Sequence, residues 1–211
     1  MLFELLFIGL FLASLIALLC VLVLAIRGLR GAALRVLKLL GAVWVVYLLI
    51  VVGVSAASAA RPQPMIPRGE EECFDEMCFS VVDVQAVSQL GPTTEPVRAG
   101  GKFYVVTVRV HSRSRGRTQR EGGLRALLWD AGKYYAVSAE GQHAWAETNS
   151  DTAGLTAQLR PGESIESVQV FDAPTESSTP GLVLSHGFTP GYFVIGECPL
   201  FQKPTVLRLS L

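Results

Sequence analysis

The first 60 residues contain only one acidic side chain, Glu4, although the whole chain of 211 residues has 18 acidic and 18 basic residues. This shortage of acids excludes a water-soluble domain of ordinary composition at the N-terminus. The zero net charge gives no long-range attraction toward nucleic acid, so we expect no nucleic-acid partner. Composition therefore divides the chain into an apolar N-terminal part and a remainder long enough for one core.

Motifs of known catalytic and metal sites are also missing. His111, His143 and His186 are far apart, and none belongs to a His-Glu-x-x-His spacing. There is no Gly-x-Ser-x-Gly elbow for serine hydrolysis, and the closest cysteines, Cys73 and Cys78, lack the Cys-x-x-Cys spacing of thiol oxidoreductases. We therefore expect a protein that is not an enzyme, with no catalytic residues and no cofactor.

Two long apolar runs are present instead, at residues 5–26 and 39–60. At 1.5 Å rise per residue, each 22-residue helix would reach about 33 Å, enough to cross a hydrocarbon core of about 30 Å. The connector 27–38 has four cations, Arg27, Arg30, Arg35 and Lys38, and no acid. The positive-inside rule places this loop in the cytoplasm, and both termini and the C-terminal domain on the extracytoplasmic side of the cytoplasmic membrane.

We expect the two spans to form a hairpin, in which Gly28, Gly31, Gly41 and Gly53 would permit close approach of the helices. An alternative is a cleaved signal sequence, with the connector as its charged region and Ala57-Ser58-Ala59 as its cleavage site. Both interpretations export the C-terminal domain. They differ in whether that domain stays tethered to the membrane.

Residues 61–72 follow as a linker in which Pro62, Pro64 and Pro67 predict an extended spacer. In residues 73–211, alternating apolar and polar side chains predict strands, and no helical stripe of useful length appears. The predicted strands are 79–87, 104–110, 124–129, 133–137, 155–159, 164–171, 181–185, 192–195 and 205–211. We expect an all-β domain, an antiparallel immunoglobulin-like β-sandwich, after two transmembrane helices.

Three short stretches carry a family resemblance. They are Gly101-Lys102-Phe103-Tyr104-Val105-Val106, Leu159-Arg160-Pro161-Gly162-Glu163-Ser164, and Val170-Phe171-Asp172-Ala173-Pro174 followed by Gly181-Leu182-Val183-Leu184-Ser185. Together they resemble bacterial extracytoplasmic immunoglobulin-like domains of unknown function, over roughly residues 78–211. The resemblance implies an exported binding or accessory module and supplies no catalytic residues. The helical hairpin departs from that family, whose usual N-terminus is lipid-anchored.

The four cysteines divide between the two parts of the chain. Cys20 lies in the first apolar run and is expected to pack as a small apolar residue. Cys73, Cys78 and Cys198 lie in the exported part, where disulfides are permitted. A Cys73–Cys78 bridge would close a tight turn and stabilise the fold by about 2 kcal/mol on the chain-entropy model. Pairing either cysteine with Cys198 would close a much longer loop and stabilise the fold by about 5 kcal/mol. We favour the short bridge, and spacing alone leaves the connectivity open.

Five acids surround the first cysteine pair: Glu70, Glu71, Glu72, Asp75 and Glu76. Carboxylates in this number are a possible calcium site, but no Asp-x-Asp-x-Asp-Gly pattern is present. We favour a solvated acidic turn and assign no metal ligand.

Four arginines, Arg113, Arg115, Arg117 and Arg120, alternate with small polar residues in a predicted loop. Such a strip is a possible contact for anionic headgroups or a polyanion, and a solvated loop is the simpler interpretation. The aromatic residues that follow are Trp129, Tyr134, Tyr135 and Trp145, a possible exposed patch on the neighbouring strands for which core packing is the default expectation.

These observations favour a membrane-anchored extracytoplasmic binding or accessory module that is not catalytic, with an envelope or membrane protein as partner. Two alternatives stay open. One is an envelope enzyme or metal-binding protein that uses the acidic Cys73–Cys78 segment. The other is a subunit of a membrane complex that acts through its helices.

Overall fold

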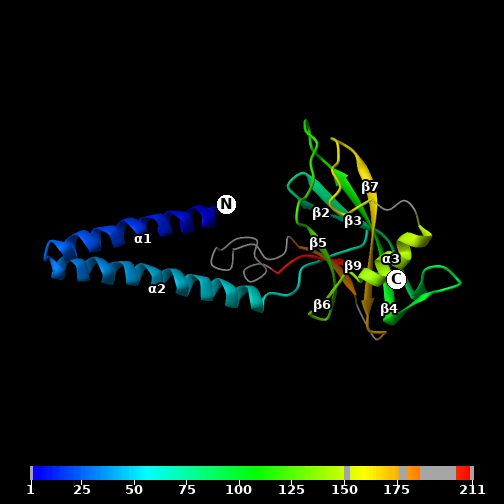
Figure 1. Cartoon of the computed structure of the whole chain (residues 1–211), viewed down its shortest axis with the longest axis horizontal. Coiled ribbons are helices and arrows are strands. Elements are labelled where there is room, and N and C mark those ends of the chain that lie inside the picture. The colour runs from blue at the N-terminus through cyan, green and yellow to red at the C-terminus, as the bar shows by residue number, and fades with distance from the viewer. Residues whose placement is uncertain (1, 150–152, 176–179, 186–202, 210–211) are drawn as a thin grey trace. The chain divides into compact units, whose positions relative to one another are not determined.

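The chain folds into two compact units in a computed structural model, shown in Figure 1, which describes residues 2–149, 153–175, 180–185 and 203–209, with only the backbone for residues 2–5. Among the described residues, the first unit comprises residues 2–62 and Lys203. The second comprises the described residues from Gln63 to Ser185 and from Pro204 to Leu209. The predicted strand 192–195, Cys198 and His186 lie outside the described residues.

Helices α1 (Leu2–Ile26) and α2 (Arg30–Ala60) form an antiparallel hairpin joined by three residues (Figure 1). Gly28, at a φ of 76°, ends α1, because Leu29 N–H donates to Leu24 O and Gly28 N–H donates to Ala25 O in a Schellman motif. The expected loop 27–38 is therefore wrong beyond Leu29. Arginine, lysine, alanine and leucine are good helix formers, and no proline interrupts this segment.

The two helices meet along a seam of side chains spaced three and four residues apart, as in left-handed helix pairs. On α1 the half-buried or buried positions are Phe7, Leu10, Ser14, Ala17, Val21 and Leu24; on α2 they include Ala33, Val36, Leu40, Trp44, Tyr47 and Val51. Trp44 Nε1 donates to Ser14 Oγ at 3.0 Å. The rings of Phe7, Trp44 and Tyr47 also pack together, with centroids 5.8 to 6.4 Å apart.

Glycines do not build this seam. A Cβ atom added at Gly9, Gly31, Gly41 or Gly53 would meet no atom of the facing helix within 4 Å. The expectation of close approach at glycine is therefore wrong for these positions. Aromatic and branched side chains hold the helices together instead.

The second unit contains two sheets. One has the strand order β1 (Met65–Ile66), β9 (Val206–Arg208), β8 (Gly181–Ser185), β5 (Arg125–Asp130) and β6 (Lys133–Ala136). The other has the order β2 (Glu71–Phe74), β3 (Met77–Leu90), β4 (Val97–Ser112) and β7 (Ser164–Ala173). All described strand pairs are antiparallel except β1–β9, which is parallel and corrects the fully antiparallel expectation.

A single core lies between these sheets, so the arrangement is a β-sandwich. Val106 and Val108 of β4 lie on either side of the half-buried Thr107 and pack with Leu128 of β5 and Leu182 of β8. In β3 the register shifts between Val81 and Asp83. After this irregularity, even-numbered side chains face the core where odd-numbered ones did before it. Val81 precedes it and Val84 follows it, yet both side chains belong to the core.

A helix that the sequence did not reveal, α3 (Ala139–Thr148), packs against β4 and β7. Ser138 caps it, accepting from Gly141 N–H at 3.1 Å. It covers a second apolar cluster on the outer face of the four-stranded sheet, formed by Phe103, Val105, Val168 and Val170 with Trp145. The ten residues of α3 carry only a short apolar stripe, so the helical periodicity of the sequence is too weak there to predict the helix.

Two other expectations are wrong. Residues 155–159 form a turn and a single bridge between Leu159 and Gln119 in place of a strand, although Leu155 and Leu159 are buried in the core. The linker 61–72 is not a free spacer, because β1 lies within it, pairs with β9 and is joined there by Gln63 Nε2 donating to Pro204 O at 2.5 Å. Its prolines flank the short strand and do not interrupt it.

Candidate functional site: the disulfide hairpin and the arginine loop

Strands β2 and β3 form a tight hairpin that places Cys73 directly opposite Cys78. The two sulfur atoms are 2.04 Å apart, and the bridge spans the turn 74–77, in which Asp75 has a φ of 51°. Cys73 is exposed and Cys78 is fully buried. The short bridge favoured from spacing is thus compatible with the strand register, while Cys198 lies outside the described residues.

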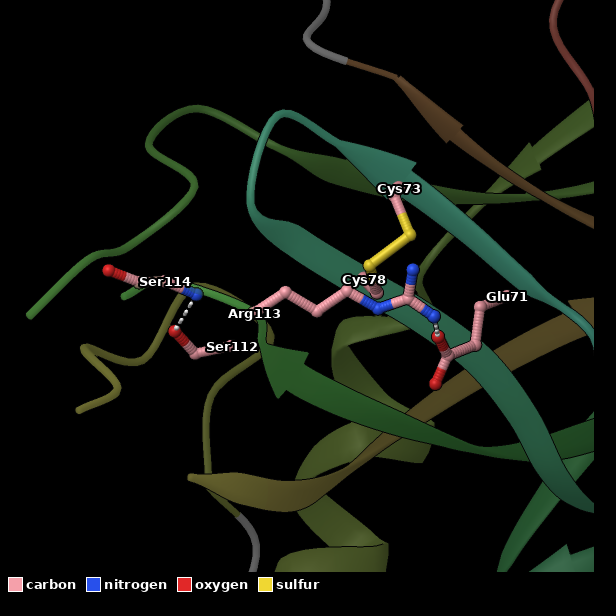
Figure 2. Close-up of a disulfide and its surroundings, with 6 residues drawn as sticks. All are labelled: Glu71, Cys73, Cys78, Ser112, Arg113 and Ser114. Atoms are coloured by element: carbon pink, nitrogen blue, oxygen red, sulfur yellow. Dashed lines mark hydrogen bonds and ion pairs between the residues drawn. A yellow bond between two sulfur atoms is a disulfide. The ribbon is translucent and has the colours of Figure 1, made fainter. Parts of the chain in front are cut away.

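Arg113 lies beside this disulfide. Figure 2 shows its side chain running past Cys78 to Glu71 on the neighbouring strand, where Nη2 lies 2.6 Å from Oε2. The pair is solvent-accessible, so its electrostatic stabilisation is at most about 1 kcal/mol. Its effect is positional, because it holds the start of the β4–β5 connection against the edge strand β2.

The connection between β4 and β5, residues 113–124, contains all four arginines and is called the arginine loop here. Several hydrogen bonds fix its base: Arg113 N–H donates to Glu76 O at 2.7 Å, Gln119 donates to the Glu76 carboxylate, and Ser114 Oγ donates to Arg117 O at 2.7 Å. The side chains of Arg115, Arg117 and Arg120 are exposed. The four arginines are therefore not equivalent: Arg113 is ion-paired and the other three extend into solvent.

The acidic residues around the disulfide diverge. Glu71 pairs with Arg113, Glu76 binds Gln119, and Glu72 lies on the opposite face of β2 from Glu71. Burial raises the pKa of the Glu72 carboxyl, and a hydrogen bond from Thr205 partly opposes that rise. Its Oε2 atom is buried without a hydrogen-bond partner among the described residues. These three carboxylates do not converge on one point as a calcium site requires.

One ligand combination does converge. Carboxylate and sulfur atoms of Glu71, Cys73 and Cys78 lie within 4.8 Å of one another. His111 is opposite Cys78 in the β3–β4 register. In the disulfide form, however, neither sulfur is a thiolate, and thiolates are the sulfur ligands of metals. Only a reduced hairpin would offer this set.

Two of the stretches that carry the family resemblance, around Gly101 and Asp172, meet at the end of the four-stranded sheet away from the disulfide, whereas the Pro161-Gly162 stretch lies at the disulfide end, beside Ser112. Asp172 accepts from Gly100 N–H at 2.8 Å and from Gly101 N–H at 3.1 Å, tying the start of the long β4 segment to the end of β7. Pro161 and Gly162, with a φ of 75° at the glycine, form a turn in which Glu163 accepts from Arg160 N–H at 2.7 Å. These residues stabilise backbone turns.

An open depression of about 490 Å³ lies beside the hairpin, lined by Arg68, Gly69, Ser80, Val81, Val82 and Arg109. Arg68 donates to Val82 O and lies 3.0 Å from Asp83, and Arg109 lies 3.3 Å from Glu166. Both guanidinium groups already have carboxylate partners. The depression therefore has little spare positive charge for an anionic ligand.

The remaining candidates are dispersed. His143 on α3 lies 3.4 Å from Glu147, and His111 lies on β4. Trp129 packs with Val183 and Val206, and Trp145 packs on the cluster under α3. The side chain of Tyr134 is partly exposed, and its partial burial raises the pKa of its phenol. Trp129 and Tyr134 lie opposite each other on β5 and β6, but Tyr135 packs on the core between the sheets and Trp145 packs on the cluster under α3, so the four aromatic residues do not form one patch.

Comparisons with known proteins give a likeness in fold only. No protein-family model matches the chain, and no curated protein matches it significantly. A conserved hypothetical protein from Bacillus anthracis aligns with a TM-score of 0.47 and 14% identity, covering 56% of this chain and 89% of its own.

Two further solved structures are similar. An uncharacterized β-sandwich protein from Clostridium difficile 630 aligns with a TM-score of 0.40 and 14% identity, covering 71% of this chain and 96% of its own. The yjhA protein from Bacillus subtilis aligns with a TM-score of 0.43 and 12% identity, covering 68% and 98%. The chain thus resembles bacterial proteins whose descriptions state no activity or ligand.

Proposed function

We propose that this protein is a two-span integral membrane protein that displays an immunoglobulin-like β-sandwich outside the cytoplasmic membrane as a non-catalytic binding or accessory module. One observation carries the membrane assignment. The two long helices are strongly apolar, with a mean hydropathy of 3.0 in α1 and 2.5 in α2, yet only 6% of the most apolar segment of each helix is buried within the protein. A core helix of a soluble protein would be mostly buried. Such apolar surface is stable in hydrocarbon and costly in water.

The orientation follows from charge. Arg27, Arg30, Arg35 and Lys38 lie at or near the hairpin turn, while the first 60 residues contain one acid, Glu4, at the other end of α1. The positive-inside rule then places the turn in the cytoplasm and the β-sandwich outside. A disulfide at Cys73–Cys78 is compatible with that oxidising side.

The tethered form is favoured over a cleaved signal sequence. Helix α2 continues through residues 57–59 to Ala60, and Ser58 is only 5% exposed. Lys203 Nζ also donates to Ala59 O at 3.0 Å and to Arg61 O at 2.5 Å. Cleavage after Ala59 would require unwinding of the helix and would separate these contacts.

The binding role is inferred from the architecture of the second unit. The connections β4 to β5 and β7 to β8 pass from one sheet to the other, as in Greek-key sandwiches of immunoglobulin type. The arginine loop is one of these connections, and its anchored base with exposed Arg115 and Arg117 suits presentation of a surface to a partner. An envelope or membrane protein is the proposed partner class.

Topology is tested with single cysteines in a chain that keeps the Cys73–Cys78 pair but has serine at positions 20 and 198. We expect Gly116→Cys, in the arginine loop, to react with a membrane-impermeant maleimide on intact cells or spheroplasts. Leu29→Cys, at the helical turn, should react only after the membrane is permeabilised. The reverse pattern would overturn the orientation, and release of an unanchored chain starting near Ala60 or Arg61 would establish cleavage.

The binding role is tested by photo-crosslinking in native membranes. A photoreactive residue is placed at Arg117 in the arginine loop or at Gly41, which lies outside the helical seam. One partner captured reproducibly from Arg117 would support the sandwich as the binding module. Capture only from Gly41 would transfer the function to the helices, as in a membrane-complex subunit. Capture from neither position would contradict a protein partner at both surfaces.

A second candidate function rests on the Glu71, Cys73 and Cys78 cluster, whose possible ligand atoms lie within 4.8 Å. After reduction by a dithiol, two thiolates and a carboxylate would suit Zn²⁺. Titration of the reduced chain with Co²⁺ should then produce a sulfur-to-metal charge-transfer band, which Cys78→Ser abolishes. A reduced chain without this band excludes a cobalt-compatible thiolate site.

A further inference from the structure

The three cations of α2 lie on the face turned away from α1. At about 100° per residue, Arg30, Arg35 and Lys38 fall within an arc of about 140°, whereas the seam residues Ala33, Val36 and Leu40 lie on the opposite side of the helix. All three cationic side chains are exposed. The hairpin therefore offers a coherent basic face and does not use these charges between its helices.

This basic face lies at the same level along the hairpin as exposed apolar side chains of α1. Because α2 begins four residues after α1 ends, Lys38 lies about 12 Å along the hairpin from its turn, at the level of about residue 18 on α1. From that level to the turn, the exposed side chains of α1 include Leu19, Leu22, Val23 and Ile26. The two predicted spans are consequently staggered by this distance when the helices pack together.

The stagger creates a conflict that neither run reveals by itself. Full immersion of residues 5–26 would bring Arg35 and Lys38 into the hydrocarbon, while exclusion of Lys38 would leave the last two turns of α1 outside it. Long basic side chains resolve such conflicts by extending their charged ends to the headgroup layer. The leucines on α2 near these cations, Leu34 and Leu37, are also exposed.

Counter-ions are absent from this part of the protein. No acidic residue occurs between Glu4 and the end of α2, and the first turn of α2 has none. The N-terminus of α2 adds its own partial positive charge, and Leu29 provides no side-chain cap. An apolar surface and an uncompensated basic face at one level match the two halves of an anionic phospholipid.

We propose that the end of the hairpin nearest its turn, residues 18–38, binds anionic phospholipid, with Arg30, Arg35 and Lys38 on the phosphate headgroup and the neighbouring leucines on the acyl chains. This inference rests on the proposed membrane insertion. It identifies a lipid class as a specific partner of the hairpin, separate from any partner of the β-sandwich.

The test uses the full chain in nanodiscs with equal amounts of phosphatidylcholine and phosphatidylglycerol, followed by native mass spectrometry of the lipids that the released protein retains. Both leaflets have the same composition, so orientation does not affect the result. Arg30→Gln, Arg35→Gln and Lys38→Gln are combined in one variant. The matched control combines Arg115→Gln, Arg117→Gln and Arg120→Gln, which removes the same charge from the arginine loop.

We expect phosphatidylglycerol to be enriched on the wild-type chain and on the arginine-loop control. The hairpin variant, which keeps Arg27, should lose most of this enrichment, because each cation near the membrane surface contributes roughly a fivefold preference. If the triple variant loses its helical circular dichroism, the single changes Arg35→Gln and Lys38→Gln replace it, each with a roughly fivefold expected loss.

Equal retention of both lipids by the wild type, or undiminished enrichment on folded hairpin variants, would overturn the inference. Loss of enrichment on the control alone would place the lipid site in the arginine loop and would also overturn it. A chain that remains inserted but shows no lipid preference would leave the proposed membrane topology intact. Failure of insertion itself would be seen separately in the maleimide labelling.

Discussion

Gly101 shows how a single residue sets the geometry of the sandwich. A Cβ atom at this position would lie 2.2 Å from the carbonyl oxygen of Ala173 and 2.9 Å from Pro174 Cα. Neither atom belongs to a flexible side chain, so the β4 and β7 backbones would have to separate. The same separation would lengthen the hydrogen bonds from Gly100 and Gly101 to Asp172.

We predict that Gly101→Ala lowers the free energy of unfolding of the sandwich by about 2 to 3 kcal/mol, the upper range for an overpacked site. Gly116→Ala is the control, because a Cβ there meets no atom within 4 Å. Urea denaturation followed by fluorescence measures both variants. Equal stability of the two would contradict the close approach of β4 and β7.

Glu72 is a second single residue that affects stability, because its ionisation makes the free energy of unfolding depend on pH. Burial raises the folded-state pKa of its carboxyl above the ordinary value for glutamate, so folding favours the protonated form. The contribution of this group to stability is fully present below its unfolded pKa and is lost as pH rises through its higher folded pKa. Protonation therefore stabilises the fold.

We predict that Glu72→Gln is more stable than the wild type at pH 7 and that the difference disappears near pH 4. Unfolding free energies measured across pH 4 to 7 test this. The matched control is Glu71→Gln on the exposed face of β2, which removes the Arg113 ion pair and should not stabilise the protein. A gain from Glu71→Gln equal to that from Glu72→Gln would attribute the effect to net charge alone.

At the scale of single elements, the β2–β3 hairpin depends on its disulfide. The two cysteines are five positions apart, and the chain-entropy model gives about 2 kcal/mol for a loop of this size. We predict that the combined change Cys73→Ser and Cys78→Ser lowers the unfolding free energy of the sandwich by about this amount under oxidising conditions. In the presence of a dithiol reductant, wild type and variant should be nearly equal. A difference that persists after reduction would implicate packing of the sulfur atoms.

The edge of β7 depends on a side chain of α3. Gln142 Oε1 accepts from Val170 N–H at 3.0 Å, and Gln142 Nε2 donates to Val168 O at 3.0 Å, so its amide substitutes for a neighbouring strand. Together with Ser138 N–H, which donates to Val170 O at 2.8 Å, it occupies part of an exposed sheet edge. The helix thus covers backbone groups that would otherwise be open to another strand.

We predict that Gln142→Ala accelerates hydrogen exchange at the Val170 amide by roughly fivefold, the effect of one net hydrogen bond. Glu147→Ala on the exposed part of the same helix is the control. Exchange of the Val170 amide is measured by nuclear magnetic resonance or mass spectrometry. Unchanged exchange in Gln142→Ala would mean that α3 does not protect this edge.

At the scale of the whole molecule, the chain divides into two compact units with separate interiors. The helical seam includes Trp44 and Ser14, and the sandwich core includes Val106 and Leu128. Substitutions that are far apart and share no contacts usually have additive effects on stability.

We therefore predict that Trp44→Ala weakens the helical hairpin and changes the unfolding free energy of the sandwich by less than about 0.5 kcal/mol. The two remaining tryptophans, Trp129 and Trp145, then report sandwich unfolding without a signal from the helices. Gly101→Ala serves as the positive control for a change within the sandwich. A large shift caused by Trp44→Ala would show that the two units are energetically coupled.

Several features of the fold could be predicted because they depend on local composition or period. Long apolar runs predicted the two helices. The alternation of apolar and polar side chains, with Tyr104, Val106 and Val108 on one side, predicted the face of β4 that lies in the core. The change in which side chains of β3 face the core could not be predicted, because it depends on a register shift against β4. Helix α3 escaped detection because its packing on β4 and β7 contributes stability that its ten residues lack alone.

At the candidate site, too, one feature could be predicted from local sequence and another could not. Cysteine spacing favoured a Cys73–Cys78 turn, but the ion pair between Arg113 and Glu71 joins residues 42 positions apart. No local pattern distinguishes Arg113 from Arg115 or Arg117. Only the path of the chain after β4 brings the first of these arginines alongside β2.

The sequence by itself determined the division into an apolar and a polar part, the helical and β character of each, and the location of the basic residues near the hairpin turn, because these depend on hydrophobicity along the chain. Tertiary structure decided which helix faces meet, how far the two apolar runs are staggered, and which carboxylates are paired or buried. Those properties depend on packing between segments distant in sequence, and side-chain pairing is decided by three-dimensional distance and desolvation.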